Sequence, residues 1–279
     1  MAVEPSNYSS PPVQYLEDPG WRGRVGFISP PSASLDHLEF LHIAPRGFAV
    51  YQTMTYVPDF GSSLLAERIS QAAQQLEHCA RTLKGAGMDC IAQCGTPFAF
   101  LTEDPYRASL ETQARIEEMV EIPFVMMGLS VVNALKHLGV QSVAVACTYY
   151  SDDIAGKYTE FLQDAGLRVL GMETFVQQGM FKNREEVDRA LFPPHRRIPV
   201  GLVYKAARIS ASHCPDAEAI VLSGGAVLTL DIIQALEHDL GKPVVSSLSA
   251  TCWEVFYRLG VGEPIRGYGQ LLAGLGLRR

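Results

Sequence analysis

The sequence lacks the motifs of metal and redox centres. Its six cysteines include no CxxC pair and no zinc-like spacing to histidine, and its seven histidines include no HExxH motif. No histidine lies in a context typical of a catalytic triad. Four cysteines lie inside apolar segments, as is typical of reduced cysteines in a cytosolic core: Cys79, Cys90, Cys147 and Cys252. We therefore expect no metal site.

Basic clusters and long apolar runs are also absent. The chain has 23 Lys and Arg against 30 Asp and Glu, a net charge of −7, and no run of basic residues. This charge argues against nucleic acid or an anionic membrane as a partner. No apolar run reaches the ~20 residues that a membrane-spanning helix needs. The N-terminus has no basic region followed by an apolar one, so we expect a cytoplasmic protein without a secretory signal.

The sequence does contain a regular alternation of apolar strands and amphipathic helices. Its 279 residues suffice for one large domain or two packed halves. Strands are predicted at 24–31, 48–57, 88–94, 142–150, 168–175, 217–225 and 242–247, and a short strand leads into a helix within 123–140. Further helices are predicted at 63–87, 106–121, 151–166, 184–191, 200–214, 229–241 and 248–260.

This alternation predicts an α/β fold with two pseudo-symmetric halves, each a parallel sheet flanked by helices, and an active-site cleft between them. We place the first half at 23–138 and the second at 139–279, with exchange of the C-terminal segment between them. Residues 1–22 are rich in Pro and Ser and are interpreted as an extended arm. Such an arm can lie on a neighbouring subunit, so a homo-oligomer is compatible with the sequence.

Two strand-end turns, one in each half, are the first candidates for a binding site. In the first, Gly95 allows a sharp bend and close approach of a ligand, Thr96 offers a hydroxyl and an N–H, and Pro97 offers no donor. In the second, Ser223, Gly224 and Gly225 offer a hydroxyl and backbone N–H groups suited to an anion. The alternative is that small residues merely make tight turns here.

Two tyrosines and one cysteine are candidates for chemistry. Tyr149 and Tyr150 follow a strand, where a phenol can donate to a carboxylate or enolate oxygen; the alternative is packing at a loop. Adjacent side chains point different ways, so we expect one of the two to face the cleft. Cys94 precedes the first turn as a candidate reactive thiol, or as a buried and inert one.

A further candidate is basic. His195, Arg196 and Arg197 form a charged segment that would suit an anionic substrate or, alternatively, a solvated face.

At these turns the sequence resembles the aspartate/glutamate racemase superfamily, in particular its arylmalonate decarboxylase and maleate isomerase branch. The resemblance runs over about residues 24–270, through the stretches GFISPP (26–31), CGTPFAF (94–100), LGVQSVAVACTYYSDD (138–153), LSGGAVLTLD (222–231), LGKPVVSS (240–247) and GYGQLL (267–272). It implies an enzyme without metal or cofactor that acts on a small carboxylate. Members of the superfamily hold a carboxylate in a ring of hydroxyl and N–H donors beside an enediolate-type intermediate.

Carried over residue by residue, the resemblance implies a site without the usual thiols. The first thiol position of the superfamily falls on Gly95, with Cys94 one residue early, and the second falls on Gly224. Pro97 and Ala226 stand where the decarboxylases have a hydroxyl donor and a glycine. Thr96, Gly225 and a tyrosine match the carboxylate-holding ring, and the tyrosine is Tyr149 or Tyr150 depending on the direction of counting. Pro30 and Pro31, with nearby Phe98 and Phe100, match an apolar wall for a substrate side group.

Three functions therefore remain open. The first is a cofactor-independent decarboxylase whose proton comes from water, Ser223 or the cleft tyrosine. The second is a maleate isomerase or racemase that uses Cys94 as its single thiol. The third is a carboxylate-binding protein without catalysis.

Overall fold

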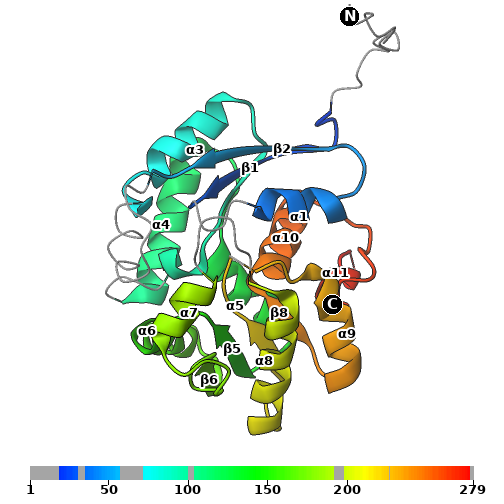
Figure 1. Ribbon diagram of the computed structural model, residues 1–279. Coiled ribbons are helices and arrows are strands. Elements are labelled where there is room, and N and C mark those ends of the chain that lie inside the picture. The colour runs from blue at the N-terminus through cyan, green and yellow to red at the C-terminus, as the bar shows by residue number, and fades with distance from the viewer. Residues whose placement is uncertain are drawn as a thin grey trace, which may run out of the picture.

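The computed structural model describes residues 19–30, 35–56, 72–99, 104–191, 198–225 and 227–276 (Figure 1). Most of the proposed N-terminal arm, Pro31, Phe100, the basic segment His195–Arg197 and Ala226 lie outside the described residues.

Two parallel sheets with the same strand order form the centre of the molecule. The first contains β1 (Gly23–Ser29), β2 (Phe48–Met54), β3 (Cys90–Gln93) and β4 (Phe124–Met126), in the order β2-β1-β3-β4. The second contains β5 (Ser142–Thr148), β6 (Arg168–Thr174), β7 (Ala219–Leu222) and β8 (Val244–Ser246), in the order β6-β5-β7-β8. The matching orders confirm the predicted α/β fold with two pseudo-symmetric halves.

Helices cover both sheets. The described helices are α1 (Asp36–Ile43), α3 (Leu76–Gly85), η3 (Thr96–Ala99), α4 (Pro105–Val120), α5 (Met127–His137), α6 (Asp152–Asp164), α7 (Arg184–Leu191), α8 (Val200–His213), α9 (Leu230–Leu240), α10 (Ser247–Arg258) and α11 (Gln270–Ala273). Because both faces are covered, the central strands β3 and β7 are buried at every residue, which explains why β7 is apolar throughout and β3 is apolar up to Gln93.

Helix α10 belongs to the second half in sequence but packs on the sheet of the first half. Phe256 on α10 stacks on Phe40 of α1, with ring centroids 4.7 Å apart, and meets Phe48 of β2 edge to face at 5.6 Å. Figure 1 shows α10 beside α1, although the two helices are far apart in the sequence. Helix α10 also packs against α5, its counterpart in the first half. The two halves therefore share a core, and the carboxyl ends of their strands are held close together.

A half-buried carboxylate joins α1 to α9. Glu39 accepts hydrogen bonds from the backbone N–H groups of Thr229 and Leu230 at the N-terminus of α9. Burial first, and then the negative charge of Asp231, raise the pKa of Glu39 from the ordinary 4.5 to about 7. Between these two values the folded protein holds a proton that the unfolded chain has released, so stability falls as the pH rises through this window.

The Glu39→Gln variant tests this linkage. Because an amide does not ionise, we expect the free energy of unfolding of the variant to lose part of its decrease between about pH 4.5 and 7. The variant should therefore gain stability relative to the native protein at pH 8. Urea unfolding at pH 5 and pH 8 measures both values. A native-like pH dependence in Glu39→Gln would contradict this interpretation.

Candidate active site

The first strand-end turn is rigidly held. Gly95 has φ +101°, a left-handed conformation that favours glycine, and its N–H donates to the sulfur of Met127 at 3.2 Å. The side-chain amide of Gln93 donates to the carbonyl oxygens of Cys94 and Gly95. Thr96 then begins η3 with its side chain fully buried. The turn is thus fixed on both sides of Gly95, with the Thr96 hydroxyl at its end.

A single serine connects this turn to the second one. The Thr96 hydroxyl donates to the Ser247 hydroxyl oxygen at 2.8 Å, and the Gly224 N–H donates to the same oxygen at 3.2 Å. Ser247 directly follows β8, so the carboxyl ends of three strands meet at this point. Our sequence analysis missed Ser247 as a site residue. The signal was present, since KPVVSS is also a strand that runs into small polar residues before a helix.

Tyr149 occupies the space that a side chain at position 224 would need. A Cβ built on Gly224 would lie 2.6 Å from Cε1 and 2.7 Å from the hydroxyl oxygen of Tyr149, far closer than real Cβ contacts. Gly224 also has φ +115°, which disfavours any other residue. The glycine at 224 and the phenol of Tyr149 therefore form a matched pair.

Tyr150 and Ser223 lie in a different environment. The Ser223 hydroxyl lies beside the phenols of Tyr150 and of Tyr158 on α6. Burial is the main reason that the pKa of Tyr150 is raised well above its ordinary value, with the nearby Tyr149 adding to it. Of the two adjacent tyrosines, Tyr149 is the one against Gly224. The pairing of β5 with β6 shifts register between Ala146 and Thr148, directly before the two tyrosines.

Helix α7 holds the backbone of Tyr149. The guanidinium of Arg184 donates to the carbonyl oxygen of Tyr149 and forms an ion pair with Asp188 at 2.8 Å. These contacts fix the loop from which the phenol projects.

Cys94 is fully buried on the side of β3 that faces α1 and α10. Burial, followed by the charge of Asp36 and a hydrogen bond with it, raises the pKa of the Cys94 thiol well above its ordinary value. Ser29 and Cys252 are its other polar neighbours. This environment disfavours the thiolate that a nucleophilic cysteine needs, so the geometry supports the inert alternative.

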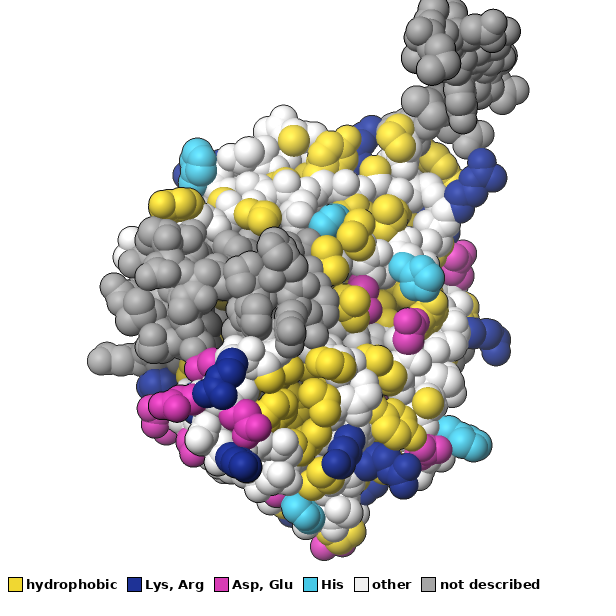
Figure 2. All heavy atoms as spheres, in the orientation of Figure 1, with side chains coloured by type: hydrophobic (Ala, Val, Ile, Leu, Met, Phe, Trp, Pro, Cys, Tyr) yellow, Lys and Arg dark blue, Asp and Glu magenta, His cyan; other side chains and the backbone are white. Residues whose placement is uncertain are grey.

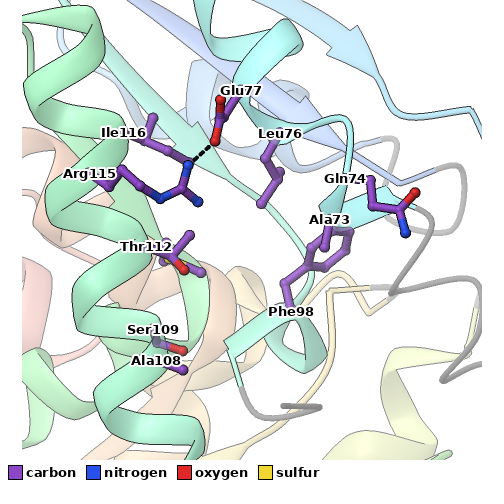
Figure 3. Close-up of a pocket in the computed structure, with 11 residues that line it drawn as sticks. Ala73, Gln74, Leu76, Glu77, Phe98, Ala108, Ser109, Thr112, Arg115 and Ile116 are labelled. Carbon is purple, nitrogen blue, oxygen red and sulfur yellow. Dashed lines mark ion pairs between the residues drawn. The ribbon is translucent and has the colours of Figure 1, made fainter. Parts of the chain in front are cut away.

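Apolar side chains stand beside Gly95. A Cβ on Gly95 would lie 3.1 Å from the ring of Phe98 and 3.4 Å from Cγ of Pro30. Phe98 also lines a pocket between α3 and α4, which the ion pair of Arg115 with Glu77 crosses (Figure 3). Pro97 is buried within η3. Pro30 and Phe98 thus give the first turn an apolar boundary.

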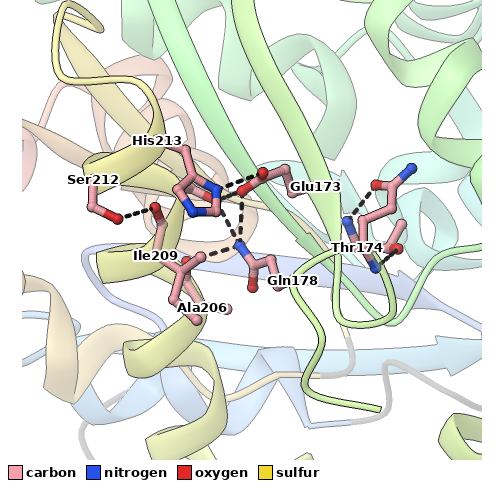
Figure 4. A network of polar contacts seen from close by, with 9 residues as sticks. Glu173, Thr174, Gln178, Ala206, Ile209, Ser212 and His213 are labelled. Carbon is pink, nitrogen blue, oxygen red and sulfur yellow. Dashed lines mark hydrogen bonds and ion pairs between the residues drawn. The ribbon is translucent and has the colours of Figure 1, made fainter. Parts of the chain in front are cut away.

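A second polar network fastens β6 to α8. Glu173 pairs with His213 at 2.8 Å, and the side-chain amide of Gln178 donates to Glu173, Ser210 and the carbonyl oxygen of Ala206 (Figure 4). His213 is half exposed, and its ring contacts a carboxylate rather than a nucleophile. We interpret this network as structural.

The surface, the metal-binding groups and the helices add three observations. On the face shown in Figure 2, Lys and Arg side chains are scattered among acidic and apolar ones. Within the described ranges, no three His, Cys, Asp or Glu side chains are grouped so as to hold a metal ion. No helix in the described part of the chain is long and apolar enough to cross a bilayer.

Two like sheets with paired strand-end turns define the type of fold found in the aspartate/glutamate racemase superfamily. A family model described as arylmalonate decarboxylase matches residues 26–272. The chain belongs to the arylmalonate decarboxylase family. It is 30% identical over 250 residues to the arylmalonate decarboxylase of Bordetella bronchiseptica, covering 88% of this chain and 95% of that one.

Solved structures agree with this assignment. A crystal structure of arylmalonate decarboxylase superimposes with a TM-score of 0.68 at 27% identity, covering 89% of this chain and 98% of that one. Maleate isomerase from Pseudomonas putida S16 gives a TM-score of 0.71 at 19% identity, covering 91% and 99%. The latter likeness shows the shared fold.

The Cys94→Ala variant separates the two roles proposed for this thiol. Because Cys94 is fully buried and its thiol lies beside Asp36, we expect turnover of an arylmalonate within about threefold of the native rate, with some loss of stability from the small cavity. Proton NMR in D₂O with the two proteins side by side measures this turnover. Activity that disappears in a folded Cys94→Ala protein would instead make Cys94 the acid or nucleophile.

Proposed function

We propose that the protein is a cofactor-independent decarboxylase of small malonate-type dicarboxylates, in which the phenol of Tyr149 protonates an enediolate intermediate. The observation that carries this proposal is the matched pair of Gly224 and Tyr149. The phenolic oxygen lies 2.7 Å from the ideal Cβ of Gly224, at the position where the resemblance places the thiol of related decarboxylases.

One carboxylate of the substrate binds in the cradle made by the two turns. The Thr96 hydroxyl and the Gly224 N–H both donate to the Ser247 oxygen, so the Ser247 hydroxyl keeps its own proton for the substrate, and the N–H of Gly225 is the second proposed donor. Such donors stabilise the negative charge that moves onto this carboxylate as the enediolate forms. The apolar side group of the substrate would lie against Pro30 and Phe98, beside Gly95.

The reaction then balances without a cofactor. The bond between the α-carbon and the leaving carboxylate breaks, carbon dioxide departs, and the electron pair enters the enediolate. The Tyr149 hydroxyl gives its proton to the α-carbon, and the resulting phenolate regains a proton from water. A positioned acid of this kind contributes roughly 10²–10⁴-fold in rate.

The alternative donors and reactions have less support. Ser223 is buried beside the phenols of Tyr150 and Tyr158. Maleate isomerisation through a thiolate, or racemisation, would require Cys94, which is enclosed with Asp36 in the core. Decarboxylation needs neither group, because stabilisation of the enediolate precedes its protonation.

The Tyr149→Phe variant tests the proposed donor. We use an alkyl-aryl malonate, whose product has a stereocentre, and follow turnover and product configuration by NMR in D₂O. Loss of the phenolic proton should lower turnover about 10²-fold, and the remaining product should lose its preference for one enantiomer because water can protonate either face.

Tyr150→Phe is the matched control. It removes an adjacent buried phenol that contacts Ser223 instead of Gly224, so it should keep the product configuration even if stability falls. Native turnover and configuration in Tyr149→Phe, or an equal loss in both variants, would refute the assignment of Tyr149. Absence of turnover by the native protein would refute the decarboxylase itself.

A further inference from the structure

The pocket between α3 and α4 lies next to the first strand-end turn (Figure 3). Its volume is about 230 Å³. An apolar cavity of ~150 Å³ already holds a benzene molecule. The apolar lining comes from four elements, through Leu76 of α3, Phe98 of η3, Ile116 of α4 and Met126 of β4, and all four side chains are buried. The pocket therefore has a well-packed apolar wall and enough space for one ring.

Most polar groups of this pocket already have partners. The Ser109 hydroxyl donates to the carbonyl oxygen of Ala99 at 2.5 Å. The guanidinium of Arg115 forms an ion pair with Glu77 across the pocket, so the two charges compensate each other. Thr112 adds a hydroxyl to the lining. A charged ligand would have to compete with the existing ion pair, whereas an uncharged ligand leaves it intact.

The lining also favours an aromatic ligand over an aliphatic one. The ring of Phe98 can pack against a second ring in an offset or edge-to-face arrangement. The thioether of Met126 contacts aromatic ring edges favourably. The planar guanidinium of Arg115 can stack on an aromatic face while it keeps its ion pair. An aliphatic ring of equal size gains none of these three interactions.

Residues that line the pocket also hold the first strand-end turn. The Phe98 N–H donates to the carbonyl oxygen of Gly95 at 3.1 Å, and the Phe98 ring lies beside Gly95. Ser109 fixes the end of η3 through its bond to the backbone. Met126 directly precedes Met127, whose sulfur accepts from the Gly95 N–H. A ligand that restricts Phe98 and Met126 therefore also restricts the turn.

We propose that this pocket is a second binding site, which takes an uncharged, single-ring aromatic molecule and, when occupied, stabilises the first strand-end turn. Phe98 is the wall that this site shares with the candidate active site. The described residues that line the pocket do not include Tyr149, Ser247 or Gly225. The site therefore goes beyond the proposed decarboxylation and does not depend on it.

Phenol binding to the native full-length protein tests the site. By isothermal titration calorimetry we expect one phenol per chain, with a dissociation constant below about 1 mM. Cyclohexanol has a similar size and the same hydroxyl but no aromatic ring, so it should bind at least about fivefold more weakly. Intermolecular NOEs between phenol and the Met126 methyl group should locate the ligand. Phenol should also slow solvent exchange of the Gly95 amide proton.

Two variants block the pocket from opposite walls. Ala108→Phe fills it from α4, and Ala73→Phe fills it from the segment before α3 (Figure 3). Each should weaken phenol binding at least about tenfold, because the new ring takes the space of the ligand. Ala114→Phe is the matched control, since it places the same side chain on an exposed position of α4 outside the pocket. It should keep the phenol affinity within about twofold of native. Circular dichroism shows which variants fold.

Absence of phenol binding by the native protein, or NOEs to residues elsewhere, would overturn the site. Native phenol affinity in a folded Ala108→Phe or Ala73→Phe protein would do the same. Equal affinity for cyclohexanol would overturn the aromatic class of ligand. Phenol binding that leaves Gly95 exchange unchanged, or accelerates it, would overturn the effect on the turn. None of these measurements involves substrate turnover, so they fail or succeed separately from the decarboxylase.

Discussion

The packing of α10 across the two halves is the constraint on which the candidate site depends. Phe256 anchors the far end of this helix among Phe40 and Phe48 of the first half. The other end of the same helix begins directly after β8, in the second half. The aromatic packing at one end of α10 and the direct connection of its other end to β8 therefore determine where the strand ends of both sheets meet. A site that no single half could form results from this arrangement.

Two residues of the candidate site, Gly224 and Tyr149, fit each other closely. Glycine at position 224 leaves space, and the phenol of Tyr149 fills it. The positive φ of Gly224 and the near contact with the ring act together, so the two residues are best considered as one feature. The phenol of Tyr149 lies in the space that a side chain at position 224 would need, and the proposed function assigns this phenol the role of the thiol that the resemblance implies for position 224.

Much of the fold could be predicted from the sequence because parallel strands that are covered on both faces are rich in apolar residues, as in β7. Helix α1 was missed: it has eight residues and no side-chain cap, and it is held by the packing of Phe40 rather than by local signals. The turn motifs around Gly95 and Gly224 were visible in the sequence. The role of Ser247, and the choice between Tyr149 and Tyr150, depend on contacts between segments far apart in the chain, and local patterns do not encode these.

The central claim is that Tyr149 occupies the space and role of a thiol at position 224, and an exchange of the two groups tests it most directly. Turnover of an arylmalonate is compared among Gly224→Cys, Tyr149→Ala and the variant carrying both changes, with and without iodoacetamide. The account predicts that Gly224→Cys alone is impaired because its Cβ meets the tyrosine ring. The combined variant should exceed Tyr149→Ala in turnover, and iodoacetamide should abolish that gain. A fully active Gly224→Cys protein, or a combined variant no better than Tyr149→Ala, would contradict the claim.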